Sequence, residues 1–514
     1  MRRAAVVAAL LALAGIPARA RAEWRPPDLA RTTATTATVL AAVRAALGAP
    51  DARFAERRER WTYAVGTRRL PVRVAVRGDD VRATVAFGEA EYAGGRTGGV
   101  RWRADANGIA HATRSDDQGD AADRLPESVF PFALADCTLA GESTRFGAAW
   151  VLVDRPPRDR PHWLYVDETT GRIVRETTRE GQRTIVTRFE DFAPLGTMVR
   201  PRRWHVTGGD AAYDMDVTVD DVEPAPLHPA DVAMPQVRRT FTLPAGARAV
   251  QLPAHFRRRT IVVDADLDGT RGGMILDTGT ASIMVDSDLA TQRRWPVVLE
   301  HATVPRVAAG AVSMSAVSTL AFPFRTAGYQ ALLGILGYDF FAGHVVHLDY
   351  AHERVDVLAE DAAPVFEDGS ATVLPASFAE GIPIVSASFG PLGGDRFTLD
   401  SGSPHLYVLA PFAQRYAREI AATWPPARFP SGRATAVPQY LEGSIVVDAR
   451  RAPSFALGAW NLGALTVGVE AANDRADAID IALDGIVGTD EMAAFEWWFD
   501  YDRGRIAVRR NGAP

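Results

Sequence analysis

The sequence predicts a mostly β protein in which two related lobes follow a strand-rich amino-terminal domain. Three observations favour this fold class. The carboxy-terminal half contains one extended pattern twice, short runs rich in β-branched and aromatic residues fill the chain before it, and helical periodicity is scarce. We therefore expect a bilobed double β-barrel, preceded by a curved sheet that resembles a half-open barrel.

The amino-terminal domain is expected to span residues 23–222. A helix is predicted at 36–47, where apolar residues recur at helical spacing before Gly48. The segment 223–237 contains four prolines, which disfavour regular pairing, so it is predicted to be a linker. Seven runs between the helix and the linker have strand composition: 72–76, 81–87, 150–153, 162–166, 173–177, 184–189 and 215–222.

The first 22 residues have the composition of a secretory signal peptide. Two arginines are followed by an apolar run and by small residues that place cleavage after Ala20 or Ala22. No later apolar run approaches the roughly 18 residues that span a bilayer. Cys137 is the only cysteine, so an intramolecular disulfide is excluded and a buried apolar role is expected. We expect an exported protein, periplasmic or secreted, with no transmembrane segment.

The composition narrows the possible chemistry. A net charge of −6 over 514 residues gives no electrostatic reason to expect a nucleic acid as partner. The chain contains no lysine, which excludes Schiff-base chemistry, a Ser/Lys dyad and a phosphate-loop lysine. No motif for a cofactor is present, so none is predicted.

The carboxy-terminal half is expected to form two lobes, 238–363 and 364–514. Each contains a Leu-Pro-Ala run, an Asp-Thr/Ser-Gly turn after an apolar strand, a Gly-apolar-apolar-Gly strand and a closing apolar-Asp-Tyr. A single turn of this kind is common by chance, but the landmarks recur in the same order. They lie at 252–254 and 374–376, 277–280 and 400–403, 334–337 and 485–488, and 348–350 and 499–501.

The two turns supply a matched pair of carboxylates, Asp277 and Asp400. Packing the lobes about a pseudo-twofold axis would bring the carboxylates face to face. Like charges about 3 Å apart cannot both ionise cheaply, so such a pair holds one proton. One carboxylate can then deprotonate a water while the other polarises a carbonyl group, which permits hydrolysis without a metal.

Both lobes resemble aspartic peptidases of the pepsin and retropepsin type. The resemblance rests on the two turns and their supporting strands, and it covers about half of the chain. It implies that Asp277 and Asp400 are catalytic, acting on a peptide or protein substrate. The residues that map onto the family pattern are Asp277, Thr278, Gly279, Thr280, Asp400, Ser401, Gly402 and Ser403.

The resemblance also assigns supporting roles. Thr278 and Ser401 are expected to lock the turns across the axis, and Thr280 and Ser403 to bond the outer carboxylate oxygens. Because both of these hydroxyls are retained, an acidic pH optimum is expected, since donors lower the pKa of a carboxyl. The strands expected to support the turns are Ile335, Leu336 and Gly337 in the first lobe and Ile486, Val487 and Gly488 in the second.

Two features depart from the family pattern. The best candidate for the hairpin flap, 304–315, lacks the tyrosine that pepsins carry there, and Tyr329 lies too close to the supporting strand to replace it. Pro404 directly after the second turn is also atypical. His405 beside that turn is a candidate for tuning specificity or pKa, although such a neighbour more often points away.

The amino-terminal half carries a looser resemblance. Residues 164–176 are similar to a hairpin in periplasmic lipoprotein-carrier domains, which form a half-open barrel around a helix. This resemblance implies a groove for a lipid or a peptide. The alternative is a β-domain that only packs on or shields the peptidase.

Other patterns point away from metal binding. The stretch 264–269 begins like a calcium loop, but Ile275 occupies the position where a bidentate glutamate is needed. His344 and His347 lie three apart, on opposite faces of a strand, without a neighbouring ligand motif. We therefore predict no metal site.

Two alternatives to a simple peptidase remain. One is a catalytically silent peptide- or lipid-binding protein on the same fold. The other is a peptidase that cuts its own chain at 223–236.

Overall fold

The structure, a computed structural model, describes fifteen stretches of the 514 residues: 28–49, 51–87, 90–112, 134, 137–154, 162–180, 183–208, 214–235, 240–298, 301–324, 331–379, 381–436, 439–440, 443–473 and 483–512. The predicted signal peptide lies outside them. The chain divides into two compact units, the first ending at Gln236 and the second beginning at Val237. None of the helices in the described stretches is long and apolar enough to cross a membrane.

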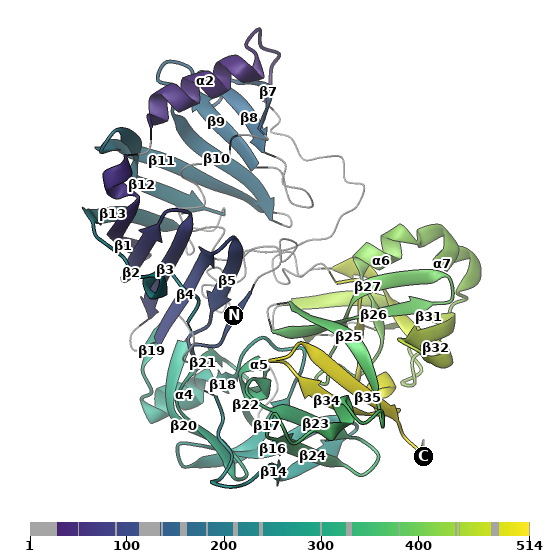
Figure 1. Cartoon of the computed structure of the whole chain (residues 1–514). Coiled ribbons are helices and arrows are strands. Elements are labelled where there is room, and N and C mark those ends of the chain that lie inside the picture. Colours follow the sequence, from purple (N-terminus) through teal and green to yellow (C-terminus); the bar gives the residue numbers. More distant parts are fainter. Residues whose placement is uncertain are drawn as a thin grey trace. The chain divides into compact units, whose positions relative to one another are not determined.

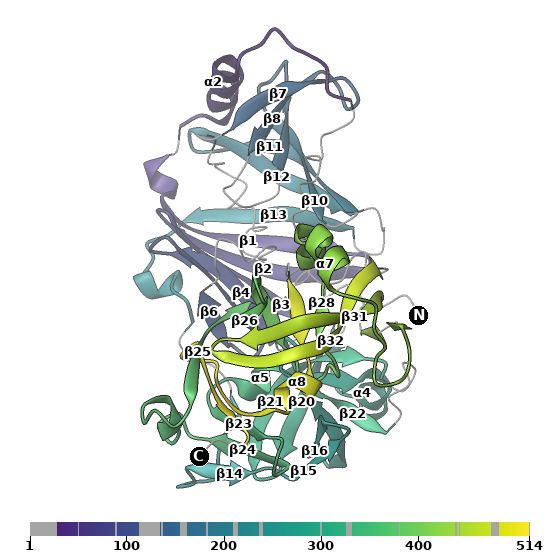
Figure 2. The same cartoon turned by 90° about the vertical axis from the view of Figure 1, so that its right-hand side faces the viewer.

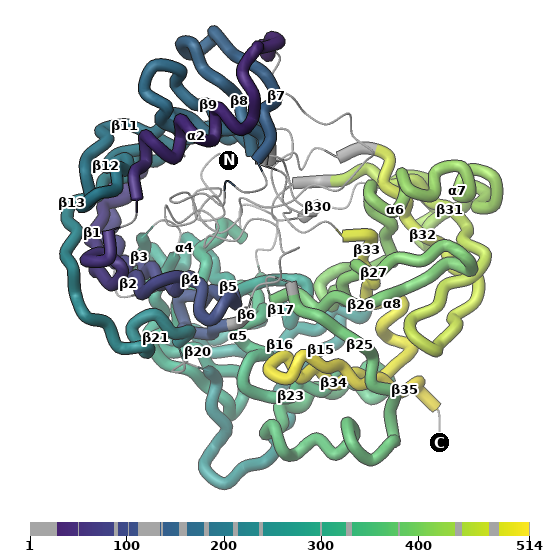
Figure 3. Tube along the Cα trace, turned by 45° about the horizontal axis from the view of Figure 1, so that its top comes forward, coloured from purple at the N-terminus to yellow at the C-terminus, as the bar shows by residue number. Residues whose placement is uncertain are grey.

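The first unit is a single antiparallel sheet of 13 strands, as its strand-rich sequence predicts, and Figure 3 shows the strands following a curved path. The order across the sheet is β6-β5-β4-β3-β2-β1-β13-β12-β11-β10-β9-β8-β7. The strands are β1 Glu56–Val65, β2 Arg68–Arg77, β3 Asp80–Phe87, β4 Ala90–Thr97, β5 Val100–Ala104, β6 Ala110–Ala112, β7 Thr138–Ser143, β8 Ala149–Asp154, β9 His162–Asp167, β10 Ile173–Glu180, β11 Arg183–Leu195, β12 Met198–Thr207 and β13 Met215–Pro224.

The helix predicted in this unit is confirmed as α2, Thr36–Leu47, which runs across one end of the sheet (Figure 1). Thr35 caps its first turn by accepting from the Thr38 amide, and Gly48 ends it at a φ of +73°. Val39 and Val43 of this helix are fully buried. Gly171 lets the β9–β10 turn approach the helix, because a Cβ there would lie 2.7 Å from the carbonyl oxygen of Ala42.

The proline-rich segment packs on the first unit over much of its length. Glu223 and Pro224 still pair with β1, and η4, Pro229–Asp231, follows under a capping box on His228. Leu227 and Val232 are buried. A chain segment held in this way has less freedom than the open linker that its prolines suggest.

In the second unit the two lobes have the same strand order. The first lobe runs β16-β17-β22-β18-β21-β20 and the second β26-β27-β33-β28-β32-β31. First-lobe elements are β15 Ala254–Arg257, β16 Thr260–Leu267, β17 Thr270–Leu276, β18 Met284–Asp286, α4 Ser287–Arg293, β19 Val297–Val298, β20 His301–Ala309, β21 Val312–Phe322, β22 Leu332–Leu336 and α5 Tyr338–Phe341.

The second lobe is the larger, as its longer spacing predicts, and its β31–β32 hairpin is prominent in Figure 2. Its elements are η5 Pro364–Phe366, β26 Ile382–Phe389, β27 Leu392–Leu399, β28 Tyr407–Val408, α6 Ala410–Arg415, α7 Ala417–Thr423, β29 Thr435–Ala436, β30 Gln439–Tyr440, β31 Gly443–Leu457, β32 Trp460–Asn473, β33 Gly485–Val487 and α8 Thr489–Met492.

Six strands from both lobes form an interlobe sheet in the order β14-β24-β23-β34-β35-β25. His347 on β23 pairs with Trp498 on β34, and their rings stack at 4.4 Å. In the sequence repeat these two positions correspond, so a pseudo-twofold axis passes between them. The strands are β14 Ala249–Gln251, β23 Val345–Asp349, β24 Arg354–Leu358, β25 Thr372–Ala379, β34 Phe495–Asp500 and β35 Arg505–Arg510.

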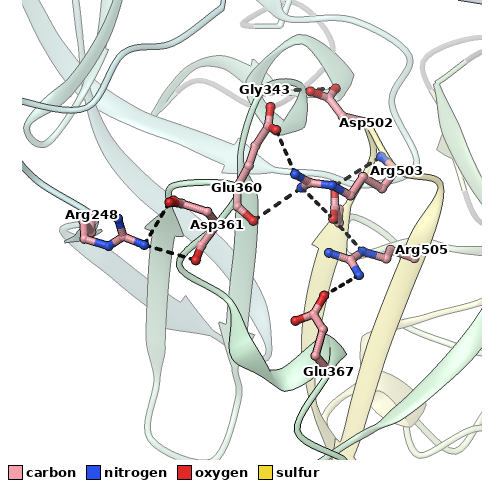
Figure 4. Close-up of polar contacts among 9 residues, drawn as sticks. Arg248, Gly343, Glu360, Asp361, Glu367, Asp502, Arg503 and Arg505 are labelled. Carbon is pink, nitrogen blue, oxygen red and sulfur yellow. Dashed lines mark hydrogen bonds and ion pairs between the residues drawn. The ribbon is translucent and has the colours of Figure 1, made fainter.

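Ion pairs connect the junction between the lobes to the last hairpin, β34–β35 (Figure 4). Arg503 contacts Glu360 at 3.2 Å, and Arg505 contacts Glu367 at 2.8 Å. Both arginines also bind Asp500, whose side chain is fully buried. The acidic stretch at the end of the first lobe is thereby tied to the second.

We expect Arg505→Gln to destabilise the second unit by about 2 kcal/mol, because it removes a charged partner from a buried carboxylate. Arg248→Gln is the matched control, since Arg248 pairs with Asp361 where both side chains are largely exposed, and it should change stability by less than about 0.5 kcal/mol. Thermal unfolding of the full chain measures both. Equal effects of the two substitutions would contradict the role of the buried Asp500.

Candidate active site

Each aspartate of the repeat lies directly after a strand that is held by a parallel neighbour. The Asp277 amide donates to the Leu336 carbonyl at 3.0 Å, and the Asp400 amide donates to the Val487 carbonyl at 3.0 Å. β17 pairs in parallel with β22, and β27 with β33. The predicted supporting strands therefore lie beside the two turns.

The glycine at the end of each supporting strand lets the chain that follows the aspartate turn pass close to that strand. A Cβ at Gly337 would lie 2.4 Å from the Ser282 carbonyl oxygen, and one at Gly488 would lie 2.6 Å from the His405 amide nitrogen. No side chain fits at such distances. The Gly-apolar-apolar-Gly pattern is therefore required by the approach of the chain after each turn.

The two turns are joined by reciprocal hydrogen bonds between buried residues. The Thr278 hydroxyl donates to the Leu399 carbonyl at 2.7 Å, and the Ser401 hydroxyl donates to the Leu276 carbonyl at 2.8 Å. Each hydroxyl also accepts from the opposite backbone, at 3.0 Å from the Ser401 amide and 3.0 Å from the Thr278 amide. The structure therefore places Thr278 and Ser401 as the sequence predicts.

The carboxyl groups of Asp277 and Asp400 lie together and interact electrostatically. A Cβ at Gly279 would lie 2.5 Å from the Asp400 carboxyl carbon, and one at Gly402 would lie 2.4 Å from Oδ2 of Asp277. Each glycine thus makes room for the carboxyl of the opposite lobe. The sequence-predicted dyad is brought into one site.

The two carboxyls are held differently, in contrast to the expected symmetry. Asp277 accepts from the Gly279 amide and the Thr280 hydroxyl, both at 2.8 Å. Asp400 accepts from the Gly402 amide at 2.8 Å and the Ser403 amide at 2.9 Å. The Ser403 hydroxyl has no hydrogen bond within the described chain, so the prediction that it bonds the outer oxygen is wrong. Pro404 follows directly and fixes the course of the backbone there.

Burial dominates the acid–base properties of the pair. It raises the pKa of Asp277, although the Thr280 hydroxyl and the Gly279 amide act in the opposite direction. Burial and the neighbouring charge of Asp277 together raise the pKa of Asp400 well above its usual range. The Thr280 hydroxyl lowers the pKa of Asp277, which is the effect from which an acidic pH optimum was predicted, but burial raises this pKa by more. The pair titrates as a unit that retains a proton.

A second polar cluster lies beside the Asp400 turn, and sequence reasoning placed only one of its members. Nδ1 of His405 lies 2.7 Å from Asp490, and Arg259 donates to the same carboxyl at 2.7 Å. These contacts lower the pKa of Asp490. Asp490 belongs to the repeat, where its counterpart Asp339 accepts from the Ile283 amide at 2.7 Å. Arg259 lies on the β15–β16 turn, so the contact joins the two lobes.

The hairpin expected to provide a flap does not cover the dyad. Its tip, at Gly310, lies against Pro253 of the same lobe. Ala309 pairs with Ala265, which pairs with Gly272, five residues before Asp277. That offset is about 16 Å along a strand. The flap assignment of 304–315 is therefore wrong, and Tyr329 lies outside the described residues.

Comparison with known proteins adds similarity of fold only. No family model matches the chain, and no curated protein matches it. A LolA superfamily protein from Nitrosomonas europaea is 14% identical over 39% of this chain and 98% of its own, with a TM-score of 0.31. Basic 7S globulin from soybean is 12% identical over 51% and 94%, with a TM-score of 0.31. An aspartic proteinase from Irpex lacteus is 12% identical over 51% and 98%, with a TM-score of 0.30.

We expect Thr278→Val to destabilise the second unit by about 3 kcal/mol, because the Leu399 carbonyl and the Ser401 amide lose their partner in a buried place. Thr278→Ser keeps the hydroxyl and should cost less than about 1 kcal/mol. Calorimetric unfolding of the full chain distinguishes them. Valine and serine variants of equal stability would show that the reciprocal bonds contribute little.

Glu491 on α8 should make stability depend on pH. Burial and the charge of Asp490 raise its pKa from 4.5 to about 8, so the folded chain keeps a proton that the unfolded chain loses near pH 4.5. Its stabilising contribution is complete below that value and is lost as the pH rises to about 8. Glu491→Gln should therefore raise stability above pH 8 by roughly 3 kcal/mol.

The control for this measurement is Glu419→Gln, at an exposed position on α7. Unfolding of the full chain is followed from pH 4 to 9 for the wild type and both variants. The Glu419 variant should keep the wild-type profile. A Glu491 variant that also keeps it would show that the carboxyl ionises in the folded chain without cost.

Proposed function

We propose that the second unit is an aspartic endopeptidase. A water molecule activated between Asp277 and Asp400 would hydrolyse the peptide bonds of its substrate. The observation that carries the proposal is the pair of carboxyls, each of which is held by its own turn and lies against the glycine of the opposite turn. Holding two carboxyls together away from bulk water is costly. A protein that used this site for binding alone would gain nothing from that cost.

The asymmetry of the pair assigns the roles. Asp277, stabilised as an anion by the Thr280 hydroxyl, acts as general base and takes a proton from a water. Asp400, whose pKa is raised further, donates its proton to the substrate carbonyl oxygen as the water oxygen attacks the carbonyl carbon. The tetrahedral diol then collapses: Asp277 gives its proton to the leaving amine, and Asp400 recovers one from the diol. The C–N bond breaks without a covalent intermediate.

The place of action is proposed to be outside the cytoplasm, periplasmic or secreted, on the basis of the signal-like residues 1–22. The first unit is proposed to bind an apolar ligand or a peptide on its curved sheet. A catalytically silent cleft for a peptide or a lipid is the competing function. This competing function makes the opposite prediction, namely that no substitution of Asp277 or Asp400 affects hydrolysis.

The test is cleavage of a denatured protein by the purified full chain between pH 3 and 7. We expect Asp277→Asn and Asp400→Asn each to reduce cleavage at least about a hundredfold, because each removes an acid–base group. Asp361→Asn, at an exposed carboxyl in the lobe junction, is the matched control and should retain wild-type activity. A pepstatin-type inhibitor is tested in parallel.

Two results would contradict the proposal. One is a folded wild-type chain that cleaves no substrate at any pH in this range. The other is cleavage that persists in both asparagine variants, which would indicate a contaminating peptidase. Intact mass after acid incubation answers the separate question of whether the chain cuts itself at 223–236.

A further inference from the structure

A group of metal-ligating side chains meets on the interlobe sheet, apart from the dyad. His347, Asp349 and Glu496 each offer one ligand atom, and these atoms all lie within 4.8 Å of one another. The sequence predicted no metal site at His347, because Glu496 is distant in the chain. The fold supplies the missing donor.

The three donors are held on two paired strands. Asp349 on β23 pairs directly with Glu496 on β34, and His347 lies two residues earlier on the same face of β23. All three side chains are largely buried, with 8–14% of their surface exposed. Donors fixed on strands need little reordering to bind an ion.

The hydrogen bonding of His347 prepares one ring nitrogen for a metal. Nδ1 lies 3.1 Å from Oδ2 of Asp356, so the neutral ring donates its proton there and leaves a lone pair on Nε2. A carboxylate behind the ring is the usual support of a histidine that ligates a metal. Arg354 lies 2.7 Å from the same carboxyl and fixes it in turn.

Nε2 of His347 faces Glu496 without a hydrogen bond. The distance to Oε2 is 3.4 Å, and the buried nitrogen has no hydrogen-bond partner among the residues that the structure describes. Two ligands of a tetrahedral zinc ion, each about 2.0–2.1 Å from the metal, lie about 3.3 Å apart. The separation thus suits two atoms that share an ion.

The surroundings supply balancing charge and a fourth donor. Asp349 and Glu496 bring two negative charges, while Arg509 binds Oε2 of Glu496 at 2.7 Å, so this oxygen would be shared between the arginine and the ion. Oδ1 of Asp349 accepts from the Ala351 and His352 amides at 3.0 Å. Nδ1 of His352 lies 2.7 Å from Oδ2, and its ring is 75% exposed, so it can turn toward an ion.

We propose that His347, Asp349 and Glu496 bind a divalent transition metal, of which Zn²⁺ best suits the mixed nitrogen and oxygen donors. The site joins β23 of the first lobe to β34 of the second beside the pseudo-twofold axis. A bound ion there fastens the two lobes to each other. The proposal is independent of the hydrolysis proposed above, because its three donors belong neither to the dyad nor to the two aspartate turns.

The experiment is calorimetric titration of the chelator-treated full chain with zinc chloride at pH 7. We expect one site in the wild type, with at least tenfold weaker binding in His347→Gln and in Glu496→Gln. Asp356→Asn leaves the ligands in place and should weaken binding by about 10- to 100-fold. The matched control is His255→Gln, since His255 forms an exposed pair with Asp264 at 3.2 Å and should not affect the site.

Cobalt provides a second readout that an unfolded variant cannot imitate. Wild-type protein with Co²⁺ should show the visible absorption of a low-coordinate ion, and His347→Gln should not, while circular dichroism confirms that the variant is folded. Zinc should raise the wild-type unfolding temperature only where the site is intact. Equal zinc affinity in wild type and His347→Gln, or no zinc binding by the wild type, overturns the proposal.

Discussion

The second unit depends on the reciprocal hydrogen bonds between Thr278 and Ser401. Each hydroxyl donates to a carbonyl of the opposite lobe and accepts from the opposite amide, so four buried backbone groups and both hydroxyls are satisfied at once. Asp277 and Asp400 directly precede these two residues in the chain, so the turns position both carboxyls. The bonds thus impose a contact that the charges of the two carboxyls would otherwise oppose.

The pseudo-twofold axis between the lobes also relates the strands of the interlobe sheet, although the side chains on these strands differ between the two lobes. His347 and Trp498 occupy corresponding positions and stack on each other across the axis. The backbone keeps the symmetry because the pairing of β23 with β34 is antiparallel and self-complementary. The side chains are free to diverge, since each faces a different neighbour. Polar function can therefore arise on one lobe without a counterpart on the other.

The sequence was most informative where structure is local or repeated. The helix at 36–47, the strand-rich character and the two aspartate turns all follow from short patterns, and the repeat placed Ile335 and Ile486 beside them. Prediction from the sequence failed where segments distant in the chain meet. The partner of His347 is Glu496, and that of His405 is Asp490, held also by Arg259. No local pattern encodes such pairs, because they depend on how the sheets close.

The role of Ser403 shows how one backbone constraint breaks a symmetric site. In the first lobe the Thr280 hydroxyl reaches the outer oxygen of Asp277, whereas in the second the Ser403 amide donates to Asp400 and its hydroxyl stays apart. Pro404 follows Ser403 and restricts its backbone. Both backbone amides donate to the same oxygen of Asp400, Oδ1, and burial together with the charge of Asp277 favours its protonated form. The pair is thus biased toward one acid and one base before any substrate arrives.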